Sequence, residues 1–156
     1  MLVHLRHFGC ILCRHFASRL AREHAKLDAA GIRVVAVGTG GRRYAAKFAA
    51  DRGIEFPVLV DRDLQSHNVI GALSGPPWGI LRPAVVRSAV EAFRDGQRQG
   101  KTGPHPWIFG AAHVFAEGGE LRYAWLNENY NDNPPLEDLL AEAMRASGVG
   151  SHPPPG

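Results

Sequence analysis

With 156 residues, of which 45% are hydrophobic and 21% charged, the chain fits one globular domain and is not expected to be disordered as a whole. Its formal net charge of +3 is small and Lys and Arg are scattered, so the sequence lacks the basic stripe that contacts phosphates and no nucleic-acid partner is expected. No apolar run approaches the ~20 residues of a membrane helix, and residues 1–7 lack the apolar region of a signal peptide, so we expect no membrane partner and a cytoplasmic location.

The chain opens with an apolar stretch followed by a helical pattern. Residues 2–5 predict a short buried strand that runs directly into a pair of cysteines, Cys10 and Cys13. The helical pattern that follows extends to about Ala30, and Gly31 is placed to end it. Its apolar face is formed by residues spaced four apart: Leu12, Phe16 and Leu20.

The next segments alternate strand and helix. Residues 33–38 are rich in β-branched side chains, which favours a buried parallel strand. Residues 42–52 predict a helix, residues 56–60 a third strand, and residues 61–70 a further helix that begins at Asp61 or Asp63. This alternation predicts right-handed crossovers and a sheet with helices on both faces.

The rhythm breaks over residues 74–106. The run at 75–79, Gly-Pro-Pro-Trp-Gly, is not expected to form a regular element. Residues 84–93 predict a helix, and residues 96–106 a loop. The region has too few apolar residues for a core of its own, so we interpret it as a helical insertion over one edge of the sheet.

The C-terminal part predicts a hairpin and a last helix. Residues 111–115 and 121–125 are the two strands of the hairpin. Asn131, Asp132 and Asn133 are placed to cap a helix that starts at Pro134 and Pro135. One domain is therefore expected over residues 1–146, followed by a disordered tail over 147–156.

The cysteine pair carries the clearest chemical signal. Two cysteines three residues apart are too few and too close for a structural disulfide framework. A helix N-terminus carries a partial positive charge, which stabilises a thiolate and lowers its pKa. Four basic or titratable residues flank the pair and are expected to add to this effect: Arg6, His7, Arg14 and His15.

The position of each thiol suggests its role. Cys10 precedes the helix and is expected to be the more exposed residue, so we assign it as the attacking nucleophile. Cys13 lies one turn into the helix, within disulfide reach of Cys10, and is assigned as the resolving thiol. Both are predicted catalytic residues.

Other interpretations of the pair remain open. The cysteines can be small buried apolar residues, or zinc ligands, although His15 is the only further ligand nearby in sequence and structural zinc needs four. Haem attachment needs a histidine where Arg14 stands. We therefore expect no metal and no cofactor. The remaining histidines that we considered, His24, His67 and His152, are interpreted as surface residues.

Several segments together carry a family resemblance. They are Leu-Arg-His-Phe-Gly-Cys-Ile-Leu-Cys-Arg at residues 5–14, Val-Ala-Val-Gly at 35–38, Phe-Pro-Val-Leu-Val-Asp at 56–61, and Gly-Gly-Glu-Leu-Arg-Tyr at 118–123, followed by Asp132 and the last helix. Over nearly its whole length the chain resembles the peroxiredoxin-like branch of the alkyl hydroperoxide reductase / thiol-specific antioxidant (AhpC/TSA) family.

This resemblance implies an α/β, thioredoxin-like fold with a central mixed sheet flanked by helices on both faces. It implies redox-active cysteines, peroxides or disulfides as substrates, and a thiol reductant such as a thioredoxin-type protein or a small thiol of the glutathione type. Relatives with this Cys-x-x-Cys also include reductases of prostaglandin-type endoperoxides. Family members usually carry strands ahead of the first cysteine strand, so the N-terminal part of the family fold is expected to be missing here.

Three functions are compatible with the sequence. The first is an enzyme, a thiol peroxidase or thiol–disulfide oxidoreductase; the others are a redox sensor and a catalytically silent binding module. A homodimer is also expected. An exposed sheet edge near the first strand and the apolar Trp78 and Phe93 of the insertion would each favour pairing with a second copy.

Overall fold

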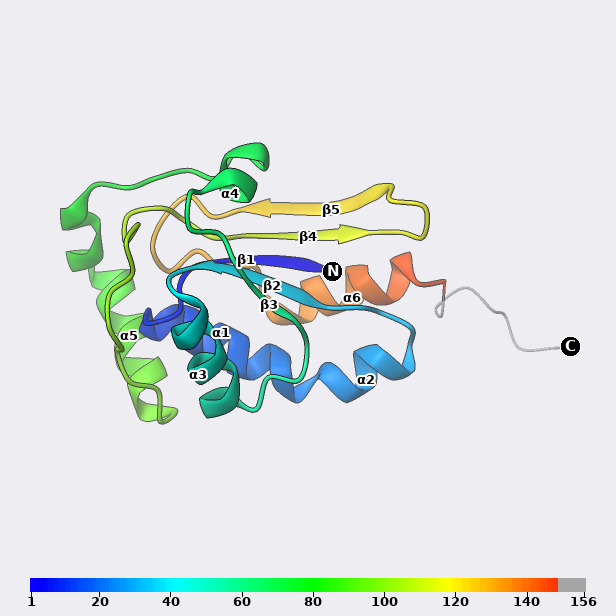
Figure 1. Ribbon diagram of the computed structural model, residues 1–156, viewed down its shortest axis with the longest axis horizontal. Helices are drawn as coiled ribbons and strands as arrows, with labels where there is room; N and C mark the ends of the chain where they lie inside the picture. The colour runs from blue at the N-terminus through cyan, green and yellow to red at the C-terminus, as the bar shows by residue number, and fades with distance from the viewer. Residues whose placement is uncertain (149–156) are drawn as a thin grey trace, which may run out of the picture.

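The computed structural model describes residues 1–148, which form one five-stranded sheet in the order β3-β2-β1-β4-β5 (Figure 1). The first strand pairs in parallel with β2, and β2 in parallel with β3, whereas β4 is antiparallel to both β1 and β5. The sheet is therefore mixed. Its strands are β1 Leu2–His7, β2 Val35–Thr39, β3 Val58–Val60, β4 Ala111–Phe115 and β5 Leu121–Leu126.

The helices pack around this sheet and at one end of it. In Figure 1, α1, α3 and α6 lie below the sheet, α4 lies above it, and α5 lies beside α1 at the left end. Their bounds are α1 Ile11–Arg22, α2 His24–Ala29, α3 Arg42–Arg52, α4 Gln65–Val69, the 3₁₀ helix η1 Pro77–Leu81, α5 Pro83–Arg94 and α6 Leu136–Ala146.

Alternation along β1 separates two environments. Val3 and Leu5 are buried in the hydrophobic core, to which α1 and α6 contribute. His4 and Arg6 point to the opposite face because successive side chains of a strand alternate. His4 contacts α4 there, with its Nε2 atom 3.2 Å from the Ser66 hydroxyl. Helices thus lie on both faces, as expected.

Two local predictions are wrong. The helix expected up to Ala30 is divided at Glu23, whose N–H bonds to the Leu20 carbonyl at 3.1 Å and tightens the last turn of α1. Gly31 follows α2 with a φ of 72°, so its role as terminator is confirmed. The Gly/Pro-rich run does form a regular element, η1, because a proline in the first turn of a helix needs no backbone donor.

The residues predicted to cap the last helix organise the preceding loop instead. The N-cap of α6 is Pro135, and within residues 1–148 no side chain bonds to that helix end. The Asn133 side chain accepts a hydrogen bond from Asn127 at 3.3 Å, and the Asp132 carboxylate accepts one from the Glu128 N–H at 2.7 Å. The helix ends at residue 146, and residues 149–156 of the expected tail lie outside the described residues.

The insertion does not cover a sheet edge. Its helix α5 packs against α1, and the His15 ring at 2.8 Å from the Asp95 carboxylate connects the two helices. The predicted exposed edge near the first strand is also wrong, because β1 is the central strand and β3 and β5 are the edges. Among the helices of residues 1–148, none is long and apolar enough to cross a membrane.

A buried polar cluster fixes α4 to the sheet. The Asp61 carboxylate accepts hydrogen bonds from the Ser66 hydroxyl and from the His67 ring Nδ1, 2.7 Å away, besides three backbone N–H groups of α4. Burial raises the pKa of Asp61, but the bonds from Ser66 and His67 outweigh it and hold that pKa well below its usual range. His67 is 0% exposed, so its predicted surface position is wrong. The fold of α4 over β1 encloses it.

We expect the free energy of unfolding to fall as the pH is lowered from about 6.5 to about 4. Burial, followed by the charges of His67 and His113, lowers the pKa of His4 to about 4. Burial, followed by the charge of Arg6, lowers the pKa of His7 to about 4. Below about pH 6.5 each ring takes up a proton in the unfolded chain but stays neutral in the fold. The free energy of unfolding should therefore fall by about 2–3 kcal/mol for each ring by the lower end of this window.

Urea unfolding at several pH values measures this loss. In the His4→Gln variant the pH-dependent loss should become smaller, because one of the buried rings with a lowered pKa is removed while His7 remains. An unchanged dependence in the variant would contradict the assignment.

Candidate active site

The turn between β1 and α1 places Cys10 at the N-terminus of the helix. Cys10 is the N-cap residue of α1, and its Sγ accepts a hydrogen bond from the Cys13 N–H at 3.4 Å. The turn passes through Gly9, where a Cβ atom would lie 1.9 Å from the backbone oxygen of Lys101. Only glycine fits this close approach. Cys10 and Cys13 are both free thiols in this structure.

A buried arginine holds the Cys10 sulfur from the other side. The Nη2 atom of Arg6 donates to Cys10 Sγ at 3.1 Å and to the Tyr130 carbonyl at 3.2 Å. Its guanidinium also lies 4.6 Å from the centre of the Tyr130 ring, within the range of a cation–π contact. The positive charge is thus fixed beside the thiol.

These contacts separate the two thiols electrostatically. The hydrogen bond from the Cys13 side chain, reinforced by the charge of Arg6, outweighs burial and lowers the pKa of Cys10 to about 6. The same bond, together with burial and the charge of Cys10, raises the pKa of Cys13 above its usual value. As the pH rises, Cys10 therefore ionises first, and Cys13 remains a thiol.

The expectation that Cys10 is the more exposed thiol is wrong. Cys10 is 4% exposed and Cys13 is 5% exposed. The reason is residues 97–103, called here the strap, which cross over the cysteine turn. Its Gly100 N–H donates to the Gly9 carbonyl at 2.7 Å, and the Gln99 side chain accepts from the Ile11 N–H at 3.0 Å.

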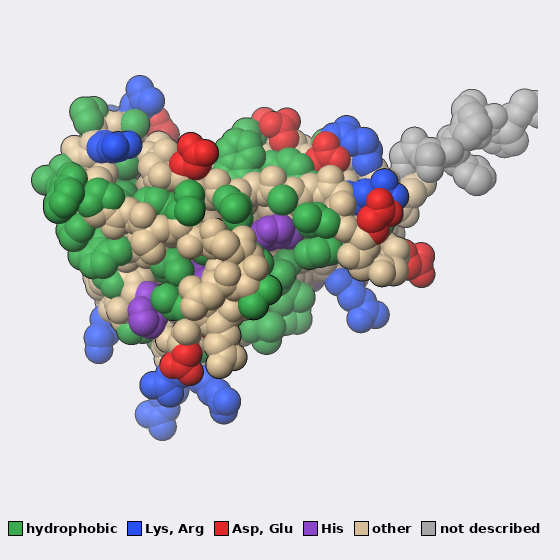
Figure 2. Space-filling view, turned by 90° about the horizontal axis from the view of Figure 1, so that it is seen from above, with side chains coloured by type: hydrophobic (Ala, Val, Ile, Leu, Met, Phe, Trp, Pro, Cys, Tyr) green, Lys and Arg blue, Asp and Glu red, His purple; other side chains and the backbone are tan. Residues whose placement is uncertain are grey.

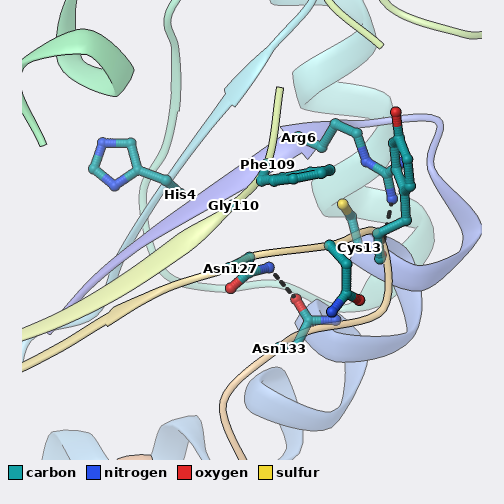
Figure 3. A pocket seen from close by; sticks show the side chains of 9 residues that line it. His4, Arg6, Cys13, Phe109, Gly110, Asn127 and Asn133 are labelled. Atoms are coloured by element: carbon teal, nitrogen blue, oxygen red, sulfur yellow. Dashed lines mark hydrogen bonds between the residues drawn. The ribbon is translucent and has the colours of Figure 1, made fainter. Parts of the chain in front are cut away.

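The two cysteines nevertheless line different spaces. Cys10 lines a groove of about 660 Å³ between α1 and α5, called here the α1–α5 groove. Cys13 lines a cavity of about 10 Å³ with Arg6, Phe109 and Asn127 (Figure 3), whereas the His4 ring points away from it. That volume is close to the space of a single water molecule, so a substrate can approach Cys10 but not Cys13.

Of the four flanking residues expected to support the thiolate, Arg6 is the one whose side chain bonds to Cys10 among residues 1–148. Arg14 pairs with Asp51 at 3.7 Å, and His15 is held by Asp95. His7 accepts a hydrogen bond from the strap and has a pKa lowered to about 4, so it is uncharged at neutral pH. No three His, Cys, Asp or Glu side chains in the described part of the chain are grouped to hold a metal.

The sequence did not indicate Tyr130 and Gln99 as parts of the site. Tyr130 is 124 positions from Arg6, and Gln99 is 88 positions from Ile11. Glycines at 100 and 103 were the available signal, because a Cβ at Gly100 would lie 2.1 Å from the Tyr44 hydroxyl and one at Gly103 would lie 2.7 Å from His7. Such glycines mark a loop that must lie close to other parts of the chain.

Comparison with known proteins finds redox relatives. A family model described as AhpC/TSA antioxidant enzyme matches residues 19–129, a span that begins after Cys13. The thioredoxin-like protein AAED1, chloroplastic, of Arabidopsis thaliana is 27% identical over 144 residues, which are 86% of this chain and 58% of that protein. The prostamide/prostaglandin F synthase of Danio rerio is 26% identical over 160 residues, or 97% of this chain and 75% of that protein.

A solved structure supports the fold. The chain superposes on one described as a thiol:disulfide interchange protein DsbE from Chlorobium tepidum with a TM-score of 0.57, covering 92% of this chain and 77% of that one. The sequences are 19% identical, so the likeness concerns the fold alone. The expected thioredoxin-like α/β fold is confirmed.

We expect alkylation of Cys10 by iodoacetamide to follow a pH profile with its midpoint near the lowered pKa of about 6, ahead of any labelling of Cys13. The Arg6→Met variant should raise this midpoint by about one unit, because it removes the charge that contacts the sulfur. Mass spectrometry of the labelled peptides measures the rate for each thiol.

Arg14→Met is the matched control, because Arg14 is also buried beside the turn but pairs with Asp51. Its midpoint should stay that of the wild type. Equal shifts in both variants would mean that Arg6 acts only through general packing.

Proposed function

Because this chain belongs to the AhpC/TSA antioxidant enzyme family, as its sequence resemblance predicted, we propose that it is a thiol oxidoreductase that reduces peroxides or disulfides through Cys10 and Cys13. Cys10 is the proposed nucleophile, and Cys13 the proposed resolving thiol. The observation that carries this assignment is the position of Cys10: it caps the N-terminus of α1, its Sγ accepts a hydrogen bond from Arg6, and the residue lines the α1–α5 groove.

With a peroxide, the Cys10 thiolate attacks the terminal oxygen of R–O–OH. The S–O bond forms, the O–O bond breaks, and the departing alkoxide takes a proton to give the alcohol, leaving a sulfenic acid on Cys10. The Cys13 thiol then attacks this sulfur, which forms the Cys10–Cys13 disulfide and releases water. With a disulfide substrate, Cys10 forms a mixed disulfide that Cys13 resolves in the same way.

A thiol reductant must complete the cycle. Two electrons and two protons from a thioredoxin-type dithiol, or from two small thiols of the glutathione type, return both cysteines to thiols. We propose the cytoplasm as the compartment, because reducing compartments keep a close thiol pair reduced. The plant relative is named chloroplastic, so cell fractionation is the measurement that decides the location.

We expect Cys10→Ser to reduce turnover of peroxide with a dithiol reductant by about 1,000-fold or more, since the serine hydroxyl is a far weaker nucleophile than a thiolate at neutral pH. Cys13→Ser should still be oxidised once, with a sulfenic acid trapped on Cys10 and no disulfide. Peroxide consumption and mass spectrometry of the two cysteines measure these outcomes.

Peroxide turnover and the reactivity of Cys10 towards thiol reagents together separate the remaining functions. A redox sensor would form the disulfide once without sustained turnover, and a silent binding module would show no reactivity of Cys10 towards thiol reagents. If Cys13→Ser protected Cys10 from oxidation, the two roles would be reversed.

We also propose that the chain forms a homodimer through the end of the molecule that carries η1. Trp78 and Leu81 of η1 are 72% and 73% exposed, and Figure 2 shows hydrophobic side chains gathered at this end. Exposed apolar patches of this kind favour association. Light scattering should give about twice the chain mass of 16.9 kDa, and Leu81→Lys should lower it towards that mass. A wild-type mass of one chain would contradict the dimer.

A further inference from the structure

The side chain of Tyr130 connects the insertion to the redox site. We propose that Tyr130 is a positioning residue: anchored by the loop of Gly75 and Pro76, it holds the Arg6 guanidinium against the Cys10 sulfur. The start of the insertion thereby becomes part of the site. This inference rests on the proposed function, because it concerns how the proposed nucleophile is kept reactive.

Tyr130 contacts Arg6 in two ways. Its carbonyl accepts a hydrogen bond at 3.2 Å from the same Nη2 atom that donates to Cys10 Sγ at 3.1 Å. The guanidinium also lies 4.6 Å from the centre of the Tyr130 ring. A long side chain such as arginine loses rotamer freedom when it is held in one place. These two contacts therefore restrict the guanidinium to the position from which it reaches the sulfur.

Tyr130 is itself fixed through its hydroxyl group. The hydroxyl donates between the carbonyls of Gly75 and Pro76, at 3.0 and 2.9 Å. Burial raises the pKa of Tyr130 above its usual value, although the charge of Arg6 opposes this shift. The hydroxyl therefore keeps its proton, and remains a donor, over the pH range in which Cys10 ionises.

The loop that offers these carbonyls is tied to the rest of the fold. The Gly75 N–H donates to the Trp107 carbonyl at 2.9 Å, and the Phe109 N–H donates to the Leu73 carbonyl at 2.7 Å. These bonds form a short antiparallel bridge immediately before β4. The anchor of the Tyr130 hydroxyl is thus held by the segment that enters the sheet.

Two glycines of this region leave room for the ring. A Cβ atom at Gly79 would lie 2.7 Å from the Tyr130 ring, and one at Gly75 would lie 3.2 Å from the Tyr130 hydroxyl. Phe109 meets the ring edge-on, with the ring centres 5.0 Å apart. Tyr130 is 4% exposed. Because the ring is enclosed in this way, its position is set by the insertion and by Phe109.

The remaining titratable groups at the cysteine turn cannot replace Arg6. Cys13 stays a thiol, His7 is uncharged at neutral pH because its pKa is lowered to about 4, and Arg14 is engaged in an ion pair. The hydrogen bond with Cys13 and then the charge of Arg6 lower the pKa of Cys10 to about 6. A displaced guanidinium should therefore be detected as a rise in this pKa.

The pH midpoint of Cys10 alkylation by iodoacetamide measures this effect in Tyr130 variants. Tyr130→Phe removes the anchor and keeps the ring, and should raise the midpoint by about 0.3–0.5 units. Tyr130→Leu also removes the aromatic face and should raise it by about one unit, close to the shift of Arg6→Met. Wild-type midpoints in both variants would overturn the inference.

A double variant separates positioning from packing. If Tyr130 acts through Arg6, the Arg6→Met/Tyr130→Leu protein should have the midpoint of Arg6→Met alone, because both changes remove the same interaction. Additive shifts would mean that Tyr130 acts independently of Arg6 and would contradict the assignment.

Tyr123→Leu is the matched control. Tyr123 of β5 also packs against the core, and its hydroxyl has no hydrogen-bond partner among residues 1–148. Its replacement should leave the midpoint of Cys10 at the wild-type value. A shift as large as that of Tyr130→Leu would show that any lost tyrosine perturbs the site, which overturns a specific role for Tyr130.

A change in the loop tests the anchor while Tyr130 stays intact. Gly79→Ala adds a Cβ atom 2.7 Å from the ring, so the displaced ring should raise the midpoint by about half a unit. Gly41→Ala is its control, because a Cβ there meets nothing within 4 Å and a φ of −95° suits alanine. An unchanged midpoint in Gly79→Ala would contradict positioning by the insertion.

The rate of Cys10 oxidation by hydrogen peroxide, followed by stopped flow, gives a second measurement. A midpoint raised from about 6 to about 7 lowers the thiolate fraction about eightfold near pH 5.5 but less than about twofold near pH 8. Tyr130→Leu should show these two losses. An equal loss at both pH values would indicate damage beyond the placement of Arg6 and overturn the inference.

Alkylation needs no oxidant, so the two proposals can fail separately. Shifted midpoints without peroxide or disulfide turnover by the wild type would refute the proposed function and leave the role of Tyr130 standing. Turnover by the wild type with unshifted midpoints in the variants would refute the role of Tyr130 alone.

Discussion

A buried guanidinium must have acceptors around it, because the desolvation of an unpaired charge costs several kcal/mol. Arg6 meets this requirement with the Cys10 sulfur, the Tyr130 carbonyl and the face of the Tyr130 ring. Three parts of the chain are thereby joined: the end of β1, the start of α1 and the loop between β5 and α6. The arginine is better satisfied when Cys10 is ionised, and the thiolate is stabilised by the arginine. The reactive form of the site and the packing around it therefore support each other.

The insertion completes this arrangement from outside the sheet. The strap closes over the cysteine turn through Gly100 and Gln99, while α5 packs on α1 and leaves a groove between them. A thiol that is buried is usually closed to substrates as well. Here the same segment covers Cys10 from one direction and leaves it open to the groove from another, so access depends on the shape and polarity of the groove more than on exposure to bulk water.

The central position of β1 explains why one short strand serves two purposes. Its odd-numbered residues Val3 and Leu5 join the hydrophobic core, and its even-numbered residues His4 and Arg6 enter polar surroundings on the other face. A strand at the edge of the sheet would leave part of this polar row in water. These polar side chains are enclosed by the segments that pack on them: His4 contacts Ser66 of α4, and Arg6 bonds to the Tyr130 carbonyl.

By itself the sequence determined the local elements and the placement of Cys10. The helix over residues 42–52 and the strand over 111–115 have their predicted bounds, and Cys10 caps α1, because apolar periodicity, glycine and the order of strand and helix act within a few residues. Tertiary structure decided which neighbour is charged and bonded to the sulfur, since Arg6, Arg14 and His15 look equivalent in sequence but meet Tyr130, Asp51 and Asp95 in the fold. It also decided the burial of Cys10 and of His67, because residues distant along the chain cover them: the strap over the first and β1 beneath the second. A burial that comes from such distant contacts leaves no periodic mark in the local sequence.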